Sequence, residues 1–185
     1  MNKKDTVVFD LDGTLLDTLE DLKNSVNYAM TQCGYPEHTL DEVRRYVGNG
    51  ILLLMQRAIP GGKDDPNFDK AFTLFKEHYG KHCNDTTKPY AGIMELLHTL
   101  KENNIKIAIV SNKADFAVKE LNAIYFKDLI PVAIGEKESE GIRKKPAPDT
   151  VIEALKQLGS TAENSVYIGD SDVDIETARN SGMDE

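Results

Sequence analysis

From residue 105 onward the sequence alternates between short apolar runs rich in β-branched residues and longer amphipathic segments. Three such runs predict strands, at residues 105–111, 130–135 and 165–170. Apolar residues at helical spacing predict helices at residues 92–103, 114–124, 147–159 and 173–182. Strands alternating with helices of this length require right-handed crossovers, which produce a parallel sheet with helices on its faces.

A further strand is predicted at residues 6–11, but a long helical segment separates it from the others. Helices in that segment are predicted at residues 17–33, 41–47, 51–59 and 66–83. The fold class is therefore α/β, a Rossmann-like parallel-sheet core with an inserted all-helical cap domain. We assign residues 1–15 and 88–185 to the core and residues 16–87 to the cap. The sequence stops at Glu185, just after a predicted helix, where another strand could be expected. The strand at 165–170 is therefore predicted at a sheet edge unless something covers it.

Composition narrows the class of partner. The 185 residues carry a formal net charge of -9, which disfavours nucleic acid and anionic membranes because both attract basic surfaces. The N-terminal MNKKDTVVFD has no apolar run of signal-peptide length, and no segment is long enough to span a membrane. Two cysteines make no disulfide framework, so we expect free thiols in a cytoplasmic protein. The sequence leaves both a monomer and a homodimer open.

Polar residues follow each predicted strand. Ligands bind at the carboxyl ends of the strands in such sheets, so these residues should converge on one rim. The residues, in chain order, are Asp10 and Asp12, Ser111 and Asn112, Lys145, and Asp170 and Asp174.

The acidic members of this set require a counter-charge. Side chains alternate along extended backbone, so Asp10 and Asp12 are predicted to point to the same side. Together with Asp170 and Asp174 they would repel one another strongly without a cation, and Mg²⁺ suits carboxylates, waters and a substrate phosphate. One aspartate of the first pair can attack phosphorus while the other transfers protons.

Each motif alone also has a structural interpretation. DLDG can be a simple turn or a calcium loop, although Leu15 and Leu16 break the calcium-loop pattern. Ser111-Asn112 can be a helix N-cap, and Lys144-Lys145 a solvated basic turn. Asp172 and Asp174 can both stabilise a helix N-terminus, and we favour that role for Asp172. The position of all four motifs after strands favours the functional interpretation.

In this order the motifs resemble those of the haloacid dehalogenase superfamily of phosphotransferases. "DLDGTLLDT" resembles the first motif, "IVSN" the second, "KKPAPD" the third and "GDSDVD" the fourth. With "YVGNG" and "YIGDSDVDIETARNSGM", the chain is most similar to the bacterial phosphoglycolate phosphatase group. The resemblance implies one more strand and helix in the core than this sequence contains.

The resemblance implies Mg²⁺-dependent hydrolysis of a small phosphorylated metabolite, with 2-phosphoglycolate favoured. Asp10 would form an aspartyl-phosphate, and Asp12 would protonate the leaving alcohol. Ser111, Asn112 and Lys145 would bind the phosphoryl group. The metal would lie among Asp10, Asp12 through its backbone carbonyl, and Asp170, with Asp174 in support. The helical insert would close over the substrate, with Gly48, Asn49 and Gly50 as its predicted substrate contacts.

Other functions on this scaffold remain open at this point. The nearest is a β-phosphoglucomutase-like phosphotransferase, followed by a pyrophosphatase or a nucleotidase. A dehalogenase is disfavoured because that chemistry needs neither Asp12 nor a metal cluster. A non-catalytic binding module would be expected to have lost the nucleophile or the metal site, and the sequence retains both.

Overall fold

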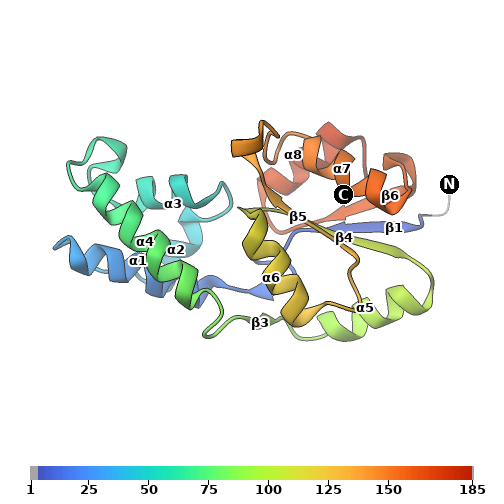
Figure 1. Ribbon diagram of the computed structural model, residues 1–185, viewed down its shortest axis with the longest axis horizontal. Helices are drawn as coiled ribbons and strands as arrows, with labels where there is room; N and C mark the ends of the chain where they lie inside the picture. Colours follow the sequence, from blue (N-terminus) through green and yellow to red (C-terminus); the bar gives the residue numbers. More distant parts are fainter. Residues whose placement is uncertain (1–3, 185) are drawn as a thin grey trace. The chain divides into compact units, whose positions relative to one another are not determined.

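The computed structural model describes residues 4–184, and these residues form two compact units (Figure 1). One unit contains the chain up to Leu16 and from Pro89 onward, and the other contains Asp17–Lys88. Two short strands, β2 (Leu16–Asp17) and β3 (Lys88–Pro89), pair where the chain crosses between the units. The insertion therefore lies between the first and second strands of the main sheet.

The main sheet is parallel, and its order is β5-β4-β1-β6. Its strands are β1 (Thr6–Phe9), β4 (Lys106–Ala114), β5 (Val132–Glu136) and β6 (Ser165–Ile168). In the centre, Val8 of β1 is in register with Ala108 of β4 on one side and Tyr167 of β6 on the other. Because all four strands are parallel, their carboxyl ends lie at one edge of the sheet, as expected from the sequence.

Helices cover both faces of this sheet (Figure 1). They are α5 (Ile93–Glu102), α6 (Asp115–Tyr125), α7 (Asp149–Leu158) and α8 (Asp172–Ser181). Phe9 and Ile109 pack with residues of α5 and α6 on one face. Val8 and Val110 pack with residues of α7 and α8 on the other. The continuous apolar character of the strands follows from burial on both faces.

The last described residues of the chain pair with β6 at the edge of the sheet. Asp184 forms a parallel bridge with Val166, and the backbone N–H of Tyr167 donates to the carbonyl of Asp184 at 2.9 Å. The strand predicted to lie at an edge thus has a backbone partner on its outer side.

The second unit is built from four α-helices around its own apolar core. They are α1 (Leu19–Gln32), α2 (Leu40–Tyr46), α3 (Ile51–Ala58) and α4 (Phe68–His82), with a 3-10 turn, η1 (Gly62–Asp64). Val26, Met30, Met55 and Phe75 are fully or almost fully buried in that core. Thr39 and Glu42 form a capping box at the start of α2, which fixes where this helix begins.

The single buried acid of α1 ties the two ends of this unit together. Asp21 is 1% exposed and accepts hydrogen bonds from the backbone N–H and the hydroxyl of both Thr86 and Thr87. These bonds satisfy the carboxylate and join the first turn of α1 to the segment that leaves the unit. A buried charge that is fully hydrogen-bonded is compatible with a stable fold.

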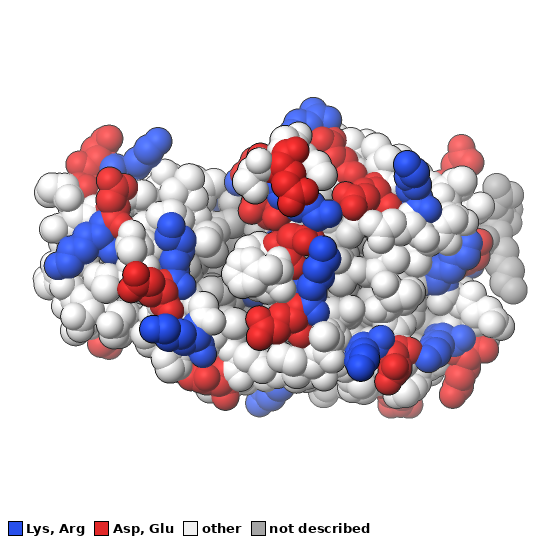
Figure 2. Space-filling view, viewed as in Figure 1, with Lys and Arg blue, Asp and Glu red and all other residues white. Residues whose placement is uncertain are grey.

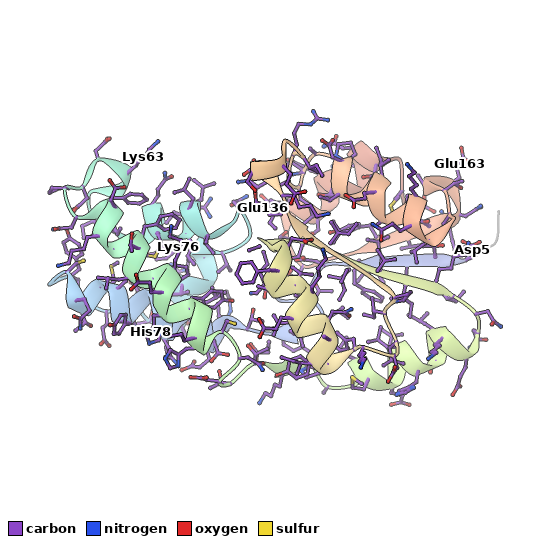
Figure 3. The ribbon with its side chains drawn as sticks, viewed as in Figure 1. Asp5, Lys63, Lys76, His78, Glu136 and Glu163 are labelled. Carbon is purple, nitrogen blue, oxygen red and sulfur yellow. The ribbon has the colours of Figure 1, made fainter. Side chains whose placement is uncertain are left out.

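His78 on α4 is engaged in packing against α1 (Figure 3). Its ring stacks on that of Tyr28, with the two ring centroids 4.4 Å apart, and its Nδ1 lies 3.0 Å from the hydroxyl of Ser25. Burial lowers its pKa from the usual value, because the charged imidazolium is disfavoured away from water.

Acidic and basic side chains are interspersed on the face shown in Figure 2. Among residues 4–184, no helix combines the length and the apolar character that crossing a bilayer requires.

Several predicted element boundaries were wrong. The first strand ends at Phe9 instead of Leu11, because the chain turns there: the N–H groups of Leu15 and Leu16 both donate to the carbonyl of Leu11. The second core strand continues to Ala114 instead of ending at Ser111, with an irregularity after Val110. The segment predicted to be entirely helical also begins with strand β2.

Candidate active site

Asp10 is the first residue after β1 and lies among other acids at the carboxyl edge of the sheet. Its backbone N–H donates to the carbonyl of Ile168 at 2.9 Å, which fixes it between β1 and β6. The residue is 8% exposed. Carboxylate oxygens of Asp10, Asp170 and Asp174 all lie within 4.8 Å of one another. The ends of β1 and β6 and the first turn of α8 thus bring three acids to one point.

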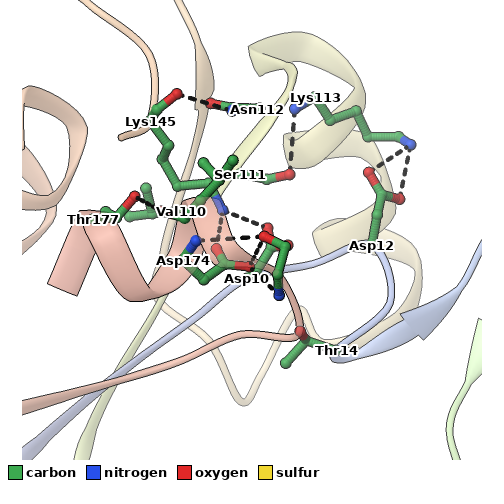
Figure 4. A network of polar contacts seen from close by, with 12 residues as sticks. Asp10, Asp12, Thr14, Val110, Ser111, Asn112, Lys113, Lys145, Asp174 and Thr177 are labelled. Atoms are coloured by element: carbon green, nitrogen blue, oxygen red, sulfur yellow. Dashed lines mark hydrogen bonds and ion pairs between the residues drawn. The ribbon is translucent and has the colours of Figure 1, made fainter. Parts of the chain in front are cut away.

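Lys145 supplies the positive charge in this cluster (Figure 4). Its Nζ lies 2.9 Å from Asp10 Oδ1 and 2.6 Å from Asp174 Oδ1. It also donates to the hydroxyl of Tyr167 at 2.9 Å. Lys145 is 4% exposed, so its ammonium group is held by these partners instead of by water.

Asp174 is positioned by the start of α8. Its Oδ2 accepts from the backbone N–H of Ser171 at 3.1 Å and from the Ser171 hydroxyl at 2.6 Å, within a capping box. Its Oδ1 faces Lys145 at 2.6 Å and the Tyr167 hydroxyl at 3.2 Å. Both carboxylate oxygens of Asp174 therefore have protein partners, and one of these partners is the Lys145 ammonium group.

Asp170 follows β6 and is the more open member of the cluster. Its Oδ1 accepts from the Thr14 hydroxyl at 3.4 Å. A Cβ on Gly13, whose φ is +85°, would lie 2.3 Å from Asp170 Oδ2, and one on Gly169 would lie 2.3 Å from Asp174 Cγ. Glycine at these two positions is therefore what allows the acids to approach the backbone so closely.

Asp12 does not join the acid cluster through its carboxylate. Both of its oxygens bind Lys113 Nζ, at 2.9 and 3.1 Å. Figure 4 shows the Asp12 side chain turned toward Lys113 and away from Asp10. Because Asp12 lies in the turn after β1, the alternation expected for extended backbone does not apply to it.

Ser111 and Asn112 lie at the irregular end of β4, beside these acids. Ser111 is 3% exposed, and its Oγ accepts from the backbone N–H of Lys113 at 3.2 Å. Asn112 donates through Nδ2 to the carbonyl of Lys145 at 3.1 Å. Asn112 thus connects β4 with the segment that carries Lys145, whereas the Ser111 bond lies within β4.

The electrostatics of the cluster favour an added cation. Burial raises the pKa of Asp10 to about 6; the charge of Lys145 opposes this shift, and the charges of Asp174 and Asp12 add to it. Burial and the charge of Asp174 also raise the pKa of Asp170. Burial would raise the pKa of Asp174, but Lys145 and Ser171 outweigh it and lower that pKa.

Burial lowers the pKa of Lys145, because it disfavours the charged ammonium group. Asp10, Tyr167 and Asp174 outweigh this effect and raise the pKa of Lys145 well above its usual value. The lysine is therefore charged. When ionised, three carboxylates and this ammonium leave an excess of two negative charges. An oxygen-ligated divalent cation fits that excess, with Asp10 and Asp170 as the carboxylates best able to bind it.

Most of the residues predicted for the site are brought together, and further residues, among them Lys113 and Tyr167, contact them. Lys113 and Tyr167 were not assigned a role from the sequence. Lys113 directly follows Ser111-Asn112, which was a usable signal, whereas nothing in the strand sequence indicates what the Tyr167 hydroxyl binds. Gly48, Asn49 and Gly50 belong to the other unit, where Asn49 Oδ1 accepts from Arg57 at 2.8 Å.

Comparison with known proteins agrees with this geometry. The sequence matches the haloacid dehalogenase-like hydrolase family over residues 7–185. The chain belongs to this family. A phosphoglycolate phosphatase of Aquifex aeolicus is 33% identical over 180 residues, covering 95% of this chain and 80% of that protein. The phosphoglycolate phosphatase of Pseudomonas putida is 31% identical over 183 residues, covering 96% of this chain and 66% of that protein.

Solved structures of this family share the architecture. A crystal structure from Lactobacillus delbrueckii subsp. bulgaricus, provisionally assigned as a phosphoglycolate phosphatase, has a TM-score of 0.90 and 36% identity. The similarity covers 99% of this chain and 85% of that one. The α/β fold with a helical insertion is therefore that of the haloacid dehalogenase-like hydrolases.

Proposed function

We propose that this protein is a Mg²⁺-dependent phosphatase that hydrolyses a small phosphate monoester, with 2-phosphoglycolate the favoured substrate, through an aspartyl-phosphate at Asp10. One observation supports this above the others: Asp10 lies at the centre of an acid cluster that also contains a buried lysine. The names of the relatives support the choice of substrate.

In the proposed mechanism Asp10 is the nucleophile. One of its carboxylate oxygens attacks phosphorus, and the bond from phosphorus to the leaving oxygen breaks. Lys145 is placed to stabilise charge on the phosphoryl oxygens, because its ammonium group is already 2.9 Å from Asp10. Ser111 and Asn112 would add polar contacts to the same group.

Asp12 would carry the protons. As a carboxylic acid it protonates the leaving alcohol, and as a carboxylate it later accepts a proton from the water that attacks phosphorus. Asp12 is suited to this because its carboxylate is separate from the acid cluster and its side chain is 27% exposed.

Asp10 and Asp170 would bind Mg²⁺, with the backbone carbonyl of Asp12 as a further ligand and Asp174 in support. When bound, the ion would offset the repulsion between the acids and the negative phosphate. The raised pKa values of Asp10 and Asp170 support this role, because two crowded carboxylates ionise fully only beside added positive charge.

The role of residues 16–87 as a cap stays a prediction from the sequence. In this proposal the helical unit excludes bulk water from the intermediate, and Gly48, Asn49 and Gly50 contact the substrate. Replacing Asn49 by alanine should then change KM for the substrate more than it changes the turnover number.

Phosphate release from a panel of phosphorylated metabolites tests the proposed function. The panel includes 2-phosphoglycolate, a sugar phosphate, pyrophosphate and a nucleoside monophosphate, each with Mg²⁺ and with excess chelator. We expect Mg²⁺-dependent phosphate release that is fastest with 2-phosphoglycolate. Equal rates in chelator, or phosphoryl transfer to a second sugar without phosphate release, would contradict the proposal.

A further inference from the structure

The ion pair between Lys113 and Asp12 is the feature of the site that the proposed mechanism does not use. Lys113 lies at the end of β4, and its ammonium group contacts both oxygens of Asp12 at 2.9 and 3.1 Å. The Lys113 side chain is 4% exposed. Two contacts from one ammonium group fix the carboxylate more firmly than a single contact would.

The position of Lys113 is itself constrained by its neighbours. Its backbone N–H donates to Ser111 Oγ at 3.2 Å, which holds the turn at the end of β4. On the other side, Asp12 lies in a turn in which the N–H of Gly13 donates to the carbonyl of Leu16 at 3.0 Å. Both partners of the ion pair are therefore carried by ordered backbone.

Without Lys113, the Asp12 carboxylate would be drawn toward a divalent cation held by Asp10 and Asp170. It is two residues from Asp10, and a carboxylate so close to a divalent cation is a ready ligand for it. A carboxylate bound to the metal cannot also exchange protons with a leaving group. The pairing with Lys113 explains why two aspartates in one motif can have different roles.

We propose that Lys113 is a positioning residue that holds the Asp12 carboxylate apart from Asp10, Asp170 and Asp174, so that this side chain transfers protons and does not bind metal. This inference rests on the proposed function. It adds a residue, and a reason for the division of labour, that neither the motif nor the chemistry of the acids requires.

The two chemical steps show where Lys113 acts. In the first, an Asp10 oxygen bonds to phosphorus, and the phosphorus–oxygen bond of the ester breaks. The leaving oxygen takes the electron pair and the Asp12 proton. In the second, water oxygen bonds to phosphorus, its proton goes to Asp12, and the bond to Asp10 breaks. Between the steps Asp12 is a carboxylate, which Lys113 stabilises.

Substrates with different leaving groups separate positioning from other roles. An alkyl ester needs a proton on its leaving oxygen, whereas p-nitrophenolate leaves without one. The ratio kcat/KM reports steps up to the first phosphoryl transfer. For K113M we expect kcat/KM to fall about 100-fold with 2-phosphoglycolate and with glycerol 3-phosphate, but less than about threefold with p-nitrophenyl phosphate.

Two further variants control for charge and geometry. K113R keeps a cation that can bind both oxygens and should recover kcat/KM to within about tenfold of the wild type. K106M removes a lysine from the opposite end of the same strand, where Lys106 donates to the carbonyl of Gly159 at 2.7 Å. It should leave all three substrates unaffected.

Metal binding gives a readout that does not depend on turnover. Titration with Mn²⁺, followed by the electron paramagnetic resonance of the free ion, should show severalfold tighter binding in K113M, because Asp12 is released toward the cluster. Weaker binding would contradict the proposal. This assay also applies if no ester is hydrolysed, so failure of the proposed function and failure of this inference are distinguishable.

Two kinetic results would overturn the inference. An equal loss with all three substrates would mean that Lys113 only supports the fold of the site. A loss confined to 2-phosphoglycolate would mean that Lys113 binds the substrate carboxylate instead of positioning Asp12.

Discussion

One buried aspartate of each unit can be compared with the other, and their pKa values shift in opposite directions. Asp21 of the helical unit is 1% exposed and Asp10 of the sheet unit is 8% exposed. Burial raises the pKa of both carboxyls, but hydrogen bonds from Thr86 and Thr87 outweigh it for Asp21 and lower its pKa. For Asp10, the charge of Lys145 opposes the effect of burial, but burial and the nearby acids outweigh it, and its pKa rises to about 6.

This difference indicates that the partners of a buried charge, more than the extent of its burial, show whether the charge stabilises the fold or serves a functional site. A carboxylate whose oxygens are satisfied by its own protein stabilises the fold. A carboxylate held near like charges lowers stability unless a ligand relieves the repulsion, and such groups concentrate at functional sites. The comparison predicts that removing the two charges will have opposite consequences for stability and activity.

The largest expected effect is on activity at Asp10. Replacing Asp10 by asparagine should reduce phosphate release by at least about 10³-fold, because the amide cannot form the proposed covalent intermediate. The melting temperature without Mg²⁺ should stay the same or rise at neutral pH, because a repulsive charge is removed. A marked loss of stability would contradict the contrast with Asp21.

Replacing Asp21 by asparagine should destabilise the helical unit by about 2–4 kcal/mol. The amide cannot accept hydrogen bonds at both of its ends, so donors of Thr86 and Thr87 lose their partner. A thermal melt should show a decrease of roughly 5–15 °C. The matched control is Asp41→Asn, since Asp41 is an exposed acid of the same unit and should change little.

The pH dependence of stability follows from the same carboxyl. Because the pKa of Asp21 is lower in the folded state, the unfolded state binds more protons at acidic pH. The stabilisation is complete above the unfolded pKa of about 4 and is lost as the pH falls through the folded pKa. Denaturant melts between pH 7 and pH 3 should therefore show a smaller loss in Asp21→Asn than in the wild type.

Asp170 extends this comparison to the binding of Mg²⁺. Replacing it by asparagine should raise the Mg²⁺ concentration needed for half-maximal activity by about 10- to 100-fold. Asp172, two residues away in the first turn of α8, provides the control. Asp172→Asn should leave the Mg²⁺ requirement unchanged, and equal effects of the two variants would refute the assignment of Asp170.

The smallest effect concerns the capping box at the start of α2, which involves no buried charge. Thr39→Ala removes the side chain that accepts from the Glu42 backbone N–H, and it should cost about 1 kcal/mol. The melting temperature should fall by roughly 2–4 °C with kcat unchanged. A decrease as large as that for Asp21→Asn would mean that capping, not the buried carboxylate, dominates the stability of this unit.

The sequence predicted the alternation of strands and helices because both periodicities are strong in this chain. It also predicted that Asp10, Asp170 and Lys145 would meet, since parallel strands bring their carboxyl ends to one edge. It could not predict where Asp12 points, because β1 ends at Phe9 and the following turn sets that direction. The partners of Tyr167 and Asp21 depend on contacts between distant segments, which local patterns do not encode.

Trapping the covalent intermediate is the decisive test of an aspartyl-phosphate at Asp10. Enzyme mixed with 2-phosphoglycolate and Mg²⁺, quenched in acid within one turnover and digested, is analysed by mass spectrometry for phosphorylated peptides. We expect a phosphoryl group on Asp10 that is absent from the Asp10→Asn variant. Rapid turnover with no phosphorylated enzyme, or with the phosphoryl group on Ser111, would contradict it.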